Sequence, residues 1–132
     1  QAFSRFLARG KPGYAERYRP QPEEALRTVR EAGGVPVLAH PVSLKVTRSR
    51  LVTIVEELVR HGLGGIEAYY PEHAPDVTAD LVNTARMFGI VATGGSDFHG
   101  QGNPLIRLGR GFGALVVPIE AVEQLRRRAG SP

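Results

Sequence analysis

The sequence contains no cysteine and no long uninterrupted run of apolar residues. The absence of cysteine excludes disulfide bonds and zinc sites built from thiolates. No apolar stretch approaches the roughly 20 residues that a membrane-spanning helix requires. We expect that residues 1–9 are not a signal peptide, because Arg5 and Arg9 interrupt the apolar residues and no long apolar core follows. We therefore expect a soluble, cytoplasmic protein that does not contact a membrane.

Lysine is scarce as well, and the basic character of the chain comes from arginine. Only Lys11 and Lys45 are lysines among the 17 basic residues, and the formal net charge is +4 at pH 7. Clusters such as Arg126 to Arg128 are typical of a solvated helix end, where cations complement the helix dipole. The same charge would attract anionic substrates or nucleic acid, so nucleic acid is a further candidate partner.

Helix-like and strand-like segments alternate along the 132 residues, which suffice for one domain with a core. Apolar stripes predict helices within residues 2–9, 22–32, 51–61, 75–88 and after Pro118. Apolar runs predict four strands, at residues 35–39, 65–70, 90–93 and 114–117. Short glycine-containing links between these units favour an α/β fold with mainly parallel strands and flanking helices. We divide the chain into a connecting segment, 1–20, and an α/β unit, 21–132.

Potential metal ligands stand at the ends of two predicted strands. Asp97 and His99 follow the third strand two residues apart, and residues i and i+2 of an extended segment point the same way. His40 ends the first strand in the same manner. The carboxyl ends of parallel strands share one edge of a sheet, and nitrogen and oxygen donors suit a divalent ion. We therefore predict a metal site made by His40, Asp97 and His99.

Two further residues have possible roles around this site. Glu67 lies inside an apolar strand, and a buried carboxylate needs a partner. We expect it to orient a metal-bound histidine, with direct ligation or a purely structural contact as alternatives. His73 follows the same strand in a loop, where it is either an exposed residue or a phosphate contact.

The remaining polar candidates are weaker. Lys11 lies on an irregular segment and is either a surface residue or a contact for phosphate. The segment 94–96, Gly-Gly-Ser, lacks a Walker pattern or a Gly-x-Ser-x-Gly motif, so we expect a tight turn near the metals rather than a nucleophile. His61 ends a predicted helix beside Gly62, and we assign it no catalytic role.

Several motifs together resemble the polymerase-and-histidinol-phosphatase (PHP) superfamily of metal-dependent phosphoesterases. Residues 32–41, AGGVPVLAHP, resemble its "AGG…LAHP" motif, and residues 65–67 resemble its "GIE" strand. Residues 96–99 resemble its last metal motif, Ser-Asp-x-His. Residues 2–14 are similar to the stretch that precedes these motifs in the TrpH-like branch.

The resemblance implies the C-terminal portion of a distorted (β/α)7 barrel. It also implies an enzyme that hydrolyses phosphate esters, including those of nucleotides or oligonucleotides, by a metal-activated hydroxide. His40, Asp97 and His99 would then bind ions of a two- or three-metal centre, for which Mn, Fe and Zn are candidates. His73 and Lys11 would neutralise the phosphate of a phosphorylated small molecule or nucleotide.

The chain departs from the family pattern at its first motif. Members of the family begin with His-x-His, whereas the histidines here are His40, His61, His73 and His99. We therefore expect the C-terminal part of a larger phosphoesterase, inactive as a fragment and prone to self-association through uncovered apolar surface.

Two other function classes remain open. The chain would also suit a non-catalytic PHP-type module with a structural or interaction role, which an intact His-x-His motif upstream would argue against. An amidohydrolase barrel acting on C–N bonds is disfavoured, because that fold usually carries a carboxylated lysine on a strand and neither lysine lies in a predicted strand.

Overall fold

The computed structural model describes residues 2–16, 18–100 and 104–129, so parts of both predicted segments, 1–20 and 21–132, lie outside the described residues. The described helices are a short π-helix at Phe3–Leu7, α1 at Pro22–Glu31, a 3₁₀ helix at Pro41–Leu44, α2 at Arg48–Arg60, α3 at Pro75–Met87 and α4 at Glu120–Arg128. The described strands are β1 at Val37–Leu38, β2 at Gly65–Tyr69 and β3 at Val91–Gly94.

The three described strands form one parallel sheet in the order β1-β2-β3. Val37 lies opposite Gly65, and Gly65 lies opposite Val91 on its other side. α2 connects β1 to β2 and α3 connects β2 to β3, as parallel neighbours require. The predicted α/β fold with a parallel sheet and flanking helices is therefore confirmed, whereas these strands form an open sheet and not a closed barrel.

The prediction of a fourth strand at residues 114–117 is wrong. This segment makes no ladder with β3, and the Val116 side chain is 77% exposed. It lies between Gly113, whose φ is 115°, and Pro118, which has no N–H to donate. Residues 114–116 instead lie across from the start of α3.

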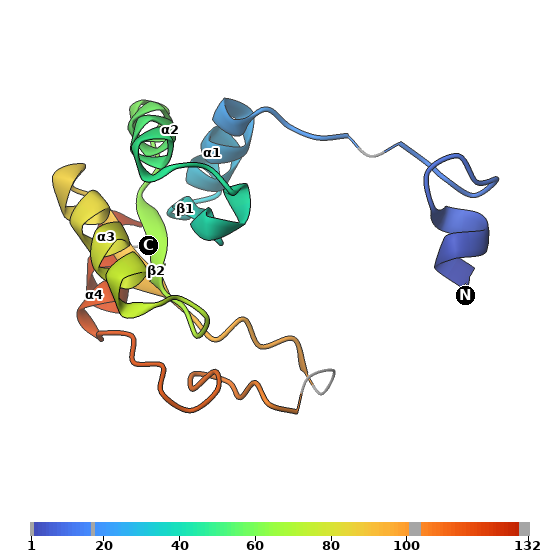
Figure 1. The fold of residues 1–132 in the computed structure, drawn as a ribbon. Helices are drawn as coiled ribbons and strands as arrows, with labels where there is room; N and C mark the ends of the chain where they lie inside the picture. Colours follow the sequence, from blue (N-terminus) through green and yellow to red (C-terminus); the bar gives the residue numbers. More distant parts are fainter. Residues whose placement is uncertain (1, 17, 101–103, 130–132) are drawn as a thin grey trace.

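The core explains why the central strand presents one polar face. Ile66 and Ala68 are fully buried and pack with Val55 of α2 and Leu81 of α3. Because side chains alternate along a strand, Glu67 points to the opposite face. α3 packs on β2 and β3, and α4 packs on β3 (Figure 1).

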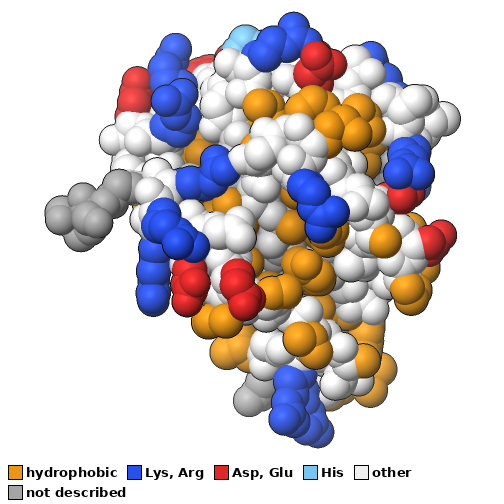
Figure 2. Space-filling view, turned by 90° about the vertical axis from the view of Figure 1, so that its left-hand side faces the viewer, with side chains coloured by type: hydrophobic (Ala, Val, Ile, Leu, Met, Phe, Trp, Pro, Cys, Tyr) orange, Lys and Arg blue, Asp and Glu red, His pale blue; other side chains and the backbone are white. Residues whose placement is uncertain are grey.

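Two regions leave apolar side chains in contact with solvent. Residues 2–16 and 18–20 run away from the sheet (Figure 1). Phe3, Phe6 and Tyr18 in these stretches are exposed. Figure 2 views the side where α3 and α4 lie, and hydrophobic side chains reach its surface between lysine and arginine side chains.

None of the helices within the described residues is long and apolar enough to span a membrane.

Gly94 allows β3 to approach β2 closely just before the candidate site. The register between the two strands shifts between Glu67 and Tyr69, and Tyr69 pairs with Gly94. A Cβ atom on Gly94 would overlap the carbonyl oxygen and the Cβ of Tyr69. A Cβ atom on the adjacent Gly95 would meet nothing within 4 Å. These neighbours therefore form a matched pair for testing the contact.

We expect Gly94→Ala to lower the free energy of unfolding by about 1–3 kcal/mol, because the backbone of Tyr69 must move to admit the new methyl group. Gly95→Ala should change it by no more than about 0.5 kcal/mol. Urea denaturation of both variants and the parent chain measures the difference. Equal stability of the two variants would show that the strands do not approach closely at Gly94.

Candidate metal centre

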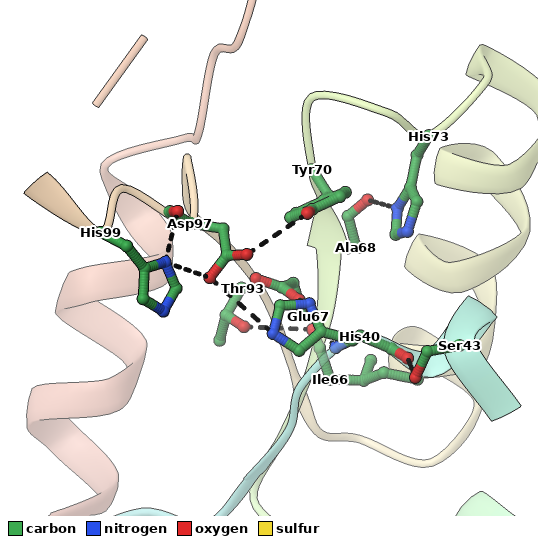
Figure 3. Close-up of polar contacts among 10 residues, drawn as sticks. All are labelled: His40, Ser43, Ile66, Glu67, Ala68, Tyr70, His73, Thr93, Asp97 and His99. Atoms are coloured by element: carbon green, nitrogen blue, oxygen red, sulfur yellow. Dashed lines mark hydrogen bonds and ion pairs between the residues drawn. The ribbon is translucent and has the colours of Figure 1, made fainter. Parts of the chain in front are cut away.

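The polar face of the sheet brings the predicted ligands together at the carboxyl ends of the strands (Figure 3). His40 follows β1, Glu67 lies in β2, and Asp97 and His99 follow β3. Asp97 Oδ1 lies 3.9 Å from His40 Nε2 and 3.5 Å from His99 Nδ1. We refer to His40, Asp97 and His99 as the donor cluster.

Glu67 holds His40 at two points. Its Oε2 atom accepts a hydrogen bond from the His40 backbone N–H at 2.8 Å and lies 3.3 Å from the ring Nδ1. The Glu67 side chain is only 13% exposed, so this contact supplies the partner that a largely buried carboxylate needs. The other ring nitrogen, Nε2, faces Asp97. A carboxylate behind a histidine whose second nitrogen faces the site is the usual arrangement around a ligated metal.

His73 and His99 each hold Nδ1 in a hydrogen bond to a backbone carbonyl oxygen. The Nδ1–H of His99 donates to the Asp97 carbonyl oxygen at 2.8 Å, and that of His73 donates to the Ala68 carbonyl oxygen at 2.9 Å. A carbonyl oxygen only accepts, so Nδ1 carries the proton in both rings. In a neutral imidazole the lone pair is then on Nε2.

Two members of the donor cluster occupy an uncommon backbone conformation. φ is 47° at His40 and 51° at Asp97, both in the left-handed region. Few residues other than glycine adopt this region, although Asp and His are enriched among them. Each carries a cost that the surrounding structure must offset, and such residues concentrate at functional sites.

Tyr70 is a member of the site that the sequence interpretation missed. Its hydroxyl donates to Asp97 Oδ2 at 3.5 Å, and its ring lies edge-on to the His40 ring with the centroids 5.6 Å apart. Burial, followed by the nearby carboxylates of Asp97, Glu72 and Glu67, raises the pKa of Tyr70 above its ordinary value. The phenol therefore stays protonated and donates to Asp97. Its only sequence signal is a tyrosine directly after a strand that carries Glu67.

Ser96 has a structural role beside the site. Its side chain is buried, and Oγ accepts a hydrogen bond from the Gly109 N–H at 3.1 Å. The hydroxyl thus fastens the segment around Gly109 next to Asp97. This contact agrees with the preference for a structural turn over a serine nucleophile at residues 94–96.

The two predicted phosphate contacts lie in different places. The His73 ring is 5.2 Å from the Tyr70 ring, on the side away from Asp97 (Figure 3). Lys11 lies on the segment that runs away from the sheet, so the structure does not bring it to the donor cluster (Figure 1). Contact with phosphate stays a prediction for both residues.

One distance within the donor cluster, between His40 and Asp97, fits two ligands of a shared ion. Two atoms that each lie about 2.1 Å from one ion can be at most about 4.2 Å apart. The separation of 3.9 Å between Asp97 Oδ1 and His40 Nε2 satisfies this limit. The 3.5 Å contact of Asp97 Oδ1 with His99 is made by the protonated Nδ1, so His99 would bind an ion through Nε2 instead. Among the described residues, however, no group of three or more His, Asp or Glu side chains is arranged to hold an ion. The donor types fit a divalent metal, while ligation by the cluster stays a prediction.

Comparison with known proteins links this geometry to phosphoester chemistry. A 5'-3' exoribonuclease Rnm of Escherichia coli is 34% identical over 93% of this chain and 41% of its own length. A phosphoribosyl 1,2-cyclic phosphate 1,2-diphosphodiesterase of Eggerthella lenta is 41% identical over 59% of this chain and 28% of its own length. A 3',5'-nucleoside bisphosphate phosphatase of Chromobacterium violaceum is 32% identical over 76% of this chain and 35% of its own length.

The chain belongs to the PHP superfamily of phosphoesterases. No family model matches the sequence. The predicted resemblance is nevertheless confirmed by these relatives, and the chain spans less than half the length of each of them.

Solved structures support this membership of the PHP superfamily. A metal-dependent phosphoesterase of Bifidobacterium adolescentis superposes with a TM-score of 0.69 at 25% identity, over 98% of this chain and 44% of its own. A structure described as an amidohydrolase of Chromobacterium violaceum, with sulfate and no metal, superposes with a TM-score of 0.60 at 32% identity. The match covers 76% of this chain and 36% of that chain.

We expect Asp97→Asn to lower the pKa of Tyr70 toward its ordinary value of 10.0, because the substitution removes one of the charges that oppose the phenolate. The pKa should stay above that value, since burial is the larger cause. NMR titration in the presence of a chelator, with Tyr70→Phe to assign the signal, measures both values.

The sign of the effect on stability follows from the same shift. The folded state holds the Tyr70 proton more tightly than the unfolded chain does. Its contribution to stability is therefore complete below pH 10.0 and is lost as the pH rises through the folded pKa. An unchanged pKa in Asp97→Asn would mean that the two groups do not interact.

Proposed function

We propose that the donor cluster binds divalent metal ions and that the protein hydrolyses phosphate esters of nucleotides or oligonucleotides. The observation that carries this proposal is the position of His40. Its ring lies with Nδ1 against Glu67 and Nε2 3.9 Å from Asp97 Oδ1. A structural histidine needs only one such partner, whereas a ligand needs one nitrogen held and the other directed at the ion.

Each residue of the site has a distinct role in this proposal. His40, Asp97 and His99 hold the ions, and Glu67 sets the orientation of the His40 ring. Tyr70 donates to the Asp97 oxygen that is turned away from His40 and limits rotation of the carboxylate. With Nδ1 held by the Ala68 carbonyl oxygen, the imidazolium form of His73 would donate from Nε2 to a phosphate oxygen. The bound ions would polarise the phosphoryl oxygens and lower the pKa of an attacking water.

The substrate class is proposed from chemistry that the relatives share. Their names describe an exoribonuclease, a nucleoside bisphosphate phosphatase and a diesterase of a phosphoribosyl cyclic phosphate. A phosphorylated ribose is common to these three names, and two of them name a nucleotide or a polynucleotide. The net charge of +4 supports an anionic partner of this kind, including nucleic acid.

We extend the proposal to the protein as a whole. Residues 21–132 are the C-terminal part of a PHP barrel in a longer cytoplasmic enzyme, and residues 1–20 form a connecting segment. Lys11 would contact the phosphate only if this segment lies differently in the complete protein than it does here. The complete centre holds two or three ions of Mn, Fe or Zn. The exposed apolar side chains support self-association of the present chain.

One observation favours a second candidate, a non-catalytic PHP-type module for structure or interaction. The described residues contain no group of three or more side chains arranged to hold an ion. An amidohydrolase receives less support, despite the name of one structural neighbour. The described strands contain no lysine, because Lys11 and Lys45 both lie outside β1, β2 and β3.

We expect the chain to bind Mn²⁺ and Asp97→Ala to weaken that binding by at least about 10-fold, because Asp97 lies within reach of both histidines of the cluster. His61→Ala should leave the affinity unchanged, since His61 ends α2 and its side chain faces Glu23 at 3.8 Å. Isothermal titration calorimetry compares the three proteins. Equal Mn²⁺ affinity in the parent chain and Asp97→Ala would remove the metal assignment.

We expect the chain to hydrolyse bis(p-nitrophenyl) phosphate with Mn²⁺ slowly or not at all. The chain extended at its N-terminus by the preceding residues of its reading frame should turn over at least about 100-fold faster, because further ligands complete the centre. Release of p-nitrophenol measures both rates, with Asp97→Ala as the inactive control. Comparable rates for both forms, abolished by Asp97→Ala, would contradict the idea of a divided centre. Inactivity of the extended form would favour the non-catalytic module.

A further inference from the structure

A pocket of about 440 Å³ adjoins the donor cluster on the far side of Tyr70. Tyr70 contacts the donor cluster and lines the pocket, because its hydroxyl donates to Asp97 while its side chain forms part of the pocket wall. His73 lines the pocket as well, and Tyr70 lies between it and Asp97 (Figure 3). The remaining walls come from the end of β2, the start of α3 and the segment before α4, which contributes Phe112, Leu115 and Val116.

The outer wall of the pocket is fastened to the site at two points. Ser96, next to Asp97, accepts the hydrogen bond from the Gly109 N–H at 3.1 Å. Gly111 is buried with φ of 51°, and it lies so close to Pro71 that a Cβ atom would overlap the proline ring. An isolated bridge between Arg107 and Gly111 closes the turn. The contacts with Ser96 and Pro71 therefore hold this turn, and with it the next residue, Phe112, at the pocket.

The lining of the pocket suits a flat aromatic ligand. The Tyr70 and His73 rings lie 5.2 Å apart with their planes inclined by 52°, and Phe112 adds a third ring. Apolar atoms of proline, leucine and valine make up much of the rest, while the Thr78 hydroxyl adds a polar group. Small-molecule pockets typically have about 300–1,000 Å³ and combine apolar and aromatic walls with few polar groups. Aromatic side chains bind nucleobases by stacking, without needing one particular base.

We propose that this pocket binds the nucleobase of a nucleotide whose phosphate lies at the donor cluster, with Phe112 as the main stacking side chain. The inference rests on the proposed function, which places a phosphate at the cluster. Tyr70 and His73 then lie between the phosphate and the base. Phe112 is 53% exposed, so a stacked base would cover apolar surface that now contacts solvent. Selection of nucleotides over other phosphate esters would come from this wall and not from the metal ligands.

The test compares AMP with ribose 5-phosphate, which has the same phosphate and sugar but no base. Equilibrium dialysis with Mn²⁺ measures the ratio of the two affinities. We expect the parent chain to prefer AMP and Phe112→Ala to reduce this preference by roughly 5- to 100-fold, the range that corresponds to loss of one stacked aromatic ring. Phe112→Tyr should retain the preference, because it keeps the ring.

Phe6→Ala is the matched control. Phe6 is as exposed as Phe112, at 53%, but lies on the segment that runs away from the sheet. Its substitution should leave the preference for AMP unchanged. A ratio near one in the parent chain, no detectable AMP binding at millimolar concentration, or an equal loss in Phe6→Ala and Phe112→Ala would each overturn the nucleobase pocket.

The same measurements separate this inference from the proposed function. If Mn²⁺ strengthens the binding of both ligands equally and AMP is not preferred, the metal site stands and the pocket assignment fails. If AMP is preferred through Phe112 but Mn²⁺ has no effect on either ligand, the pocket assignment stands and the metal site fails.

Discussion

The carboxylate of Glu67 connects the central strand, β2, to His40 at the end of β1. It lies on the polar face of the central strand and accepts from the His40 backbone N–H while facing the His40 ring. Without it, a backbone donor at the end of β1 and a ring nitrogen would both lose their partner, which costs free energy when water cannot replace the bond. A single glutamate in an otherwise apolar strand thereby determines both the position and the orientation of His40.

The site also requires backbone geometry that is unfavourable in isolation. His40 and Asp97 both have positive φ, and β3 reaches Asp97 only after passing Tyr69 at the close contact of Gly94. The free energy for these features comes from the opposite face of the sheet. There, Ile66 and Ala68 are fully buried against the helices. The buried face of β2 therefore stabilises the unfavourable backbone conformations of His40 and Asp97 beside its polar face. Rigid support of this kind keeps a binding site preorganised.

Much of this organisation was predictable from local patterns, and the errors have identifiable causes. The parallel sheet followed from alternating periodicities and short links, and the meeting of His40, Asp97 and His99 followed from their places at strand ends. The apolar run 114–117 was wrongly assigned to a strand, because such a run predicts burial but not the partner against which it is buried. It lies at the pocket beside α3 instead of extending the sheet. Tyr70 was missed since a tyrosine after a strand is not distinctive.

The sequence by itself determined the order of helices and strands, the resemblance to the PHP superfamily and the polar strand ends. These properties depend on residue spacing and on short-range backbone preferences, which a linear pattern records directly. Only the tertiary structure decided which histidine nitrogen faces the site and what partners Glu67, Tyr70 and Ser96 have. It also decided that the segment carrying Lys11 runs away from the cluster. The contacts of Glu67 with His40 and of Tyr70 with Asp97 each join residues 27 positions apart. Such contacts form only when the whole sheet has set its register, so no local pattern contains them.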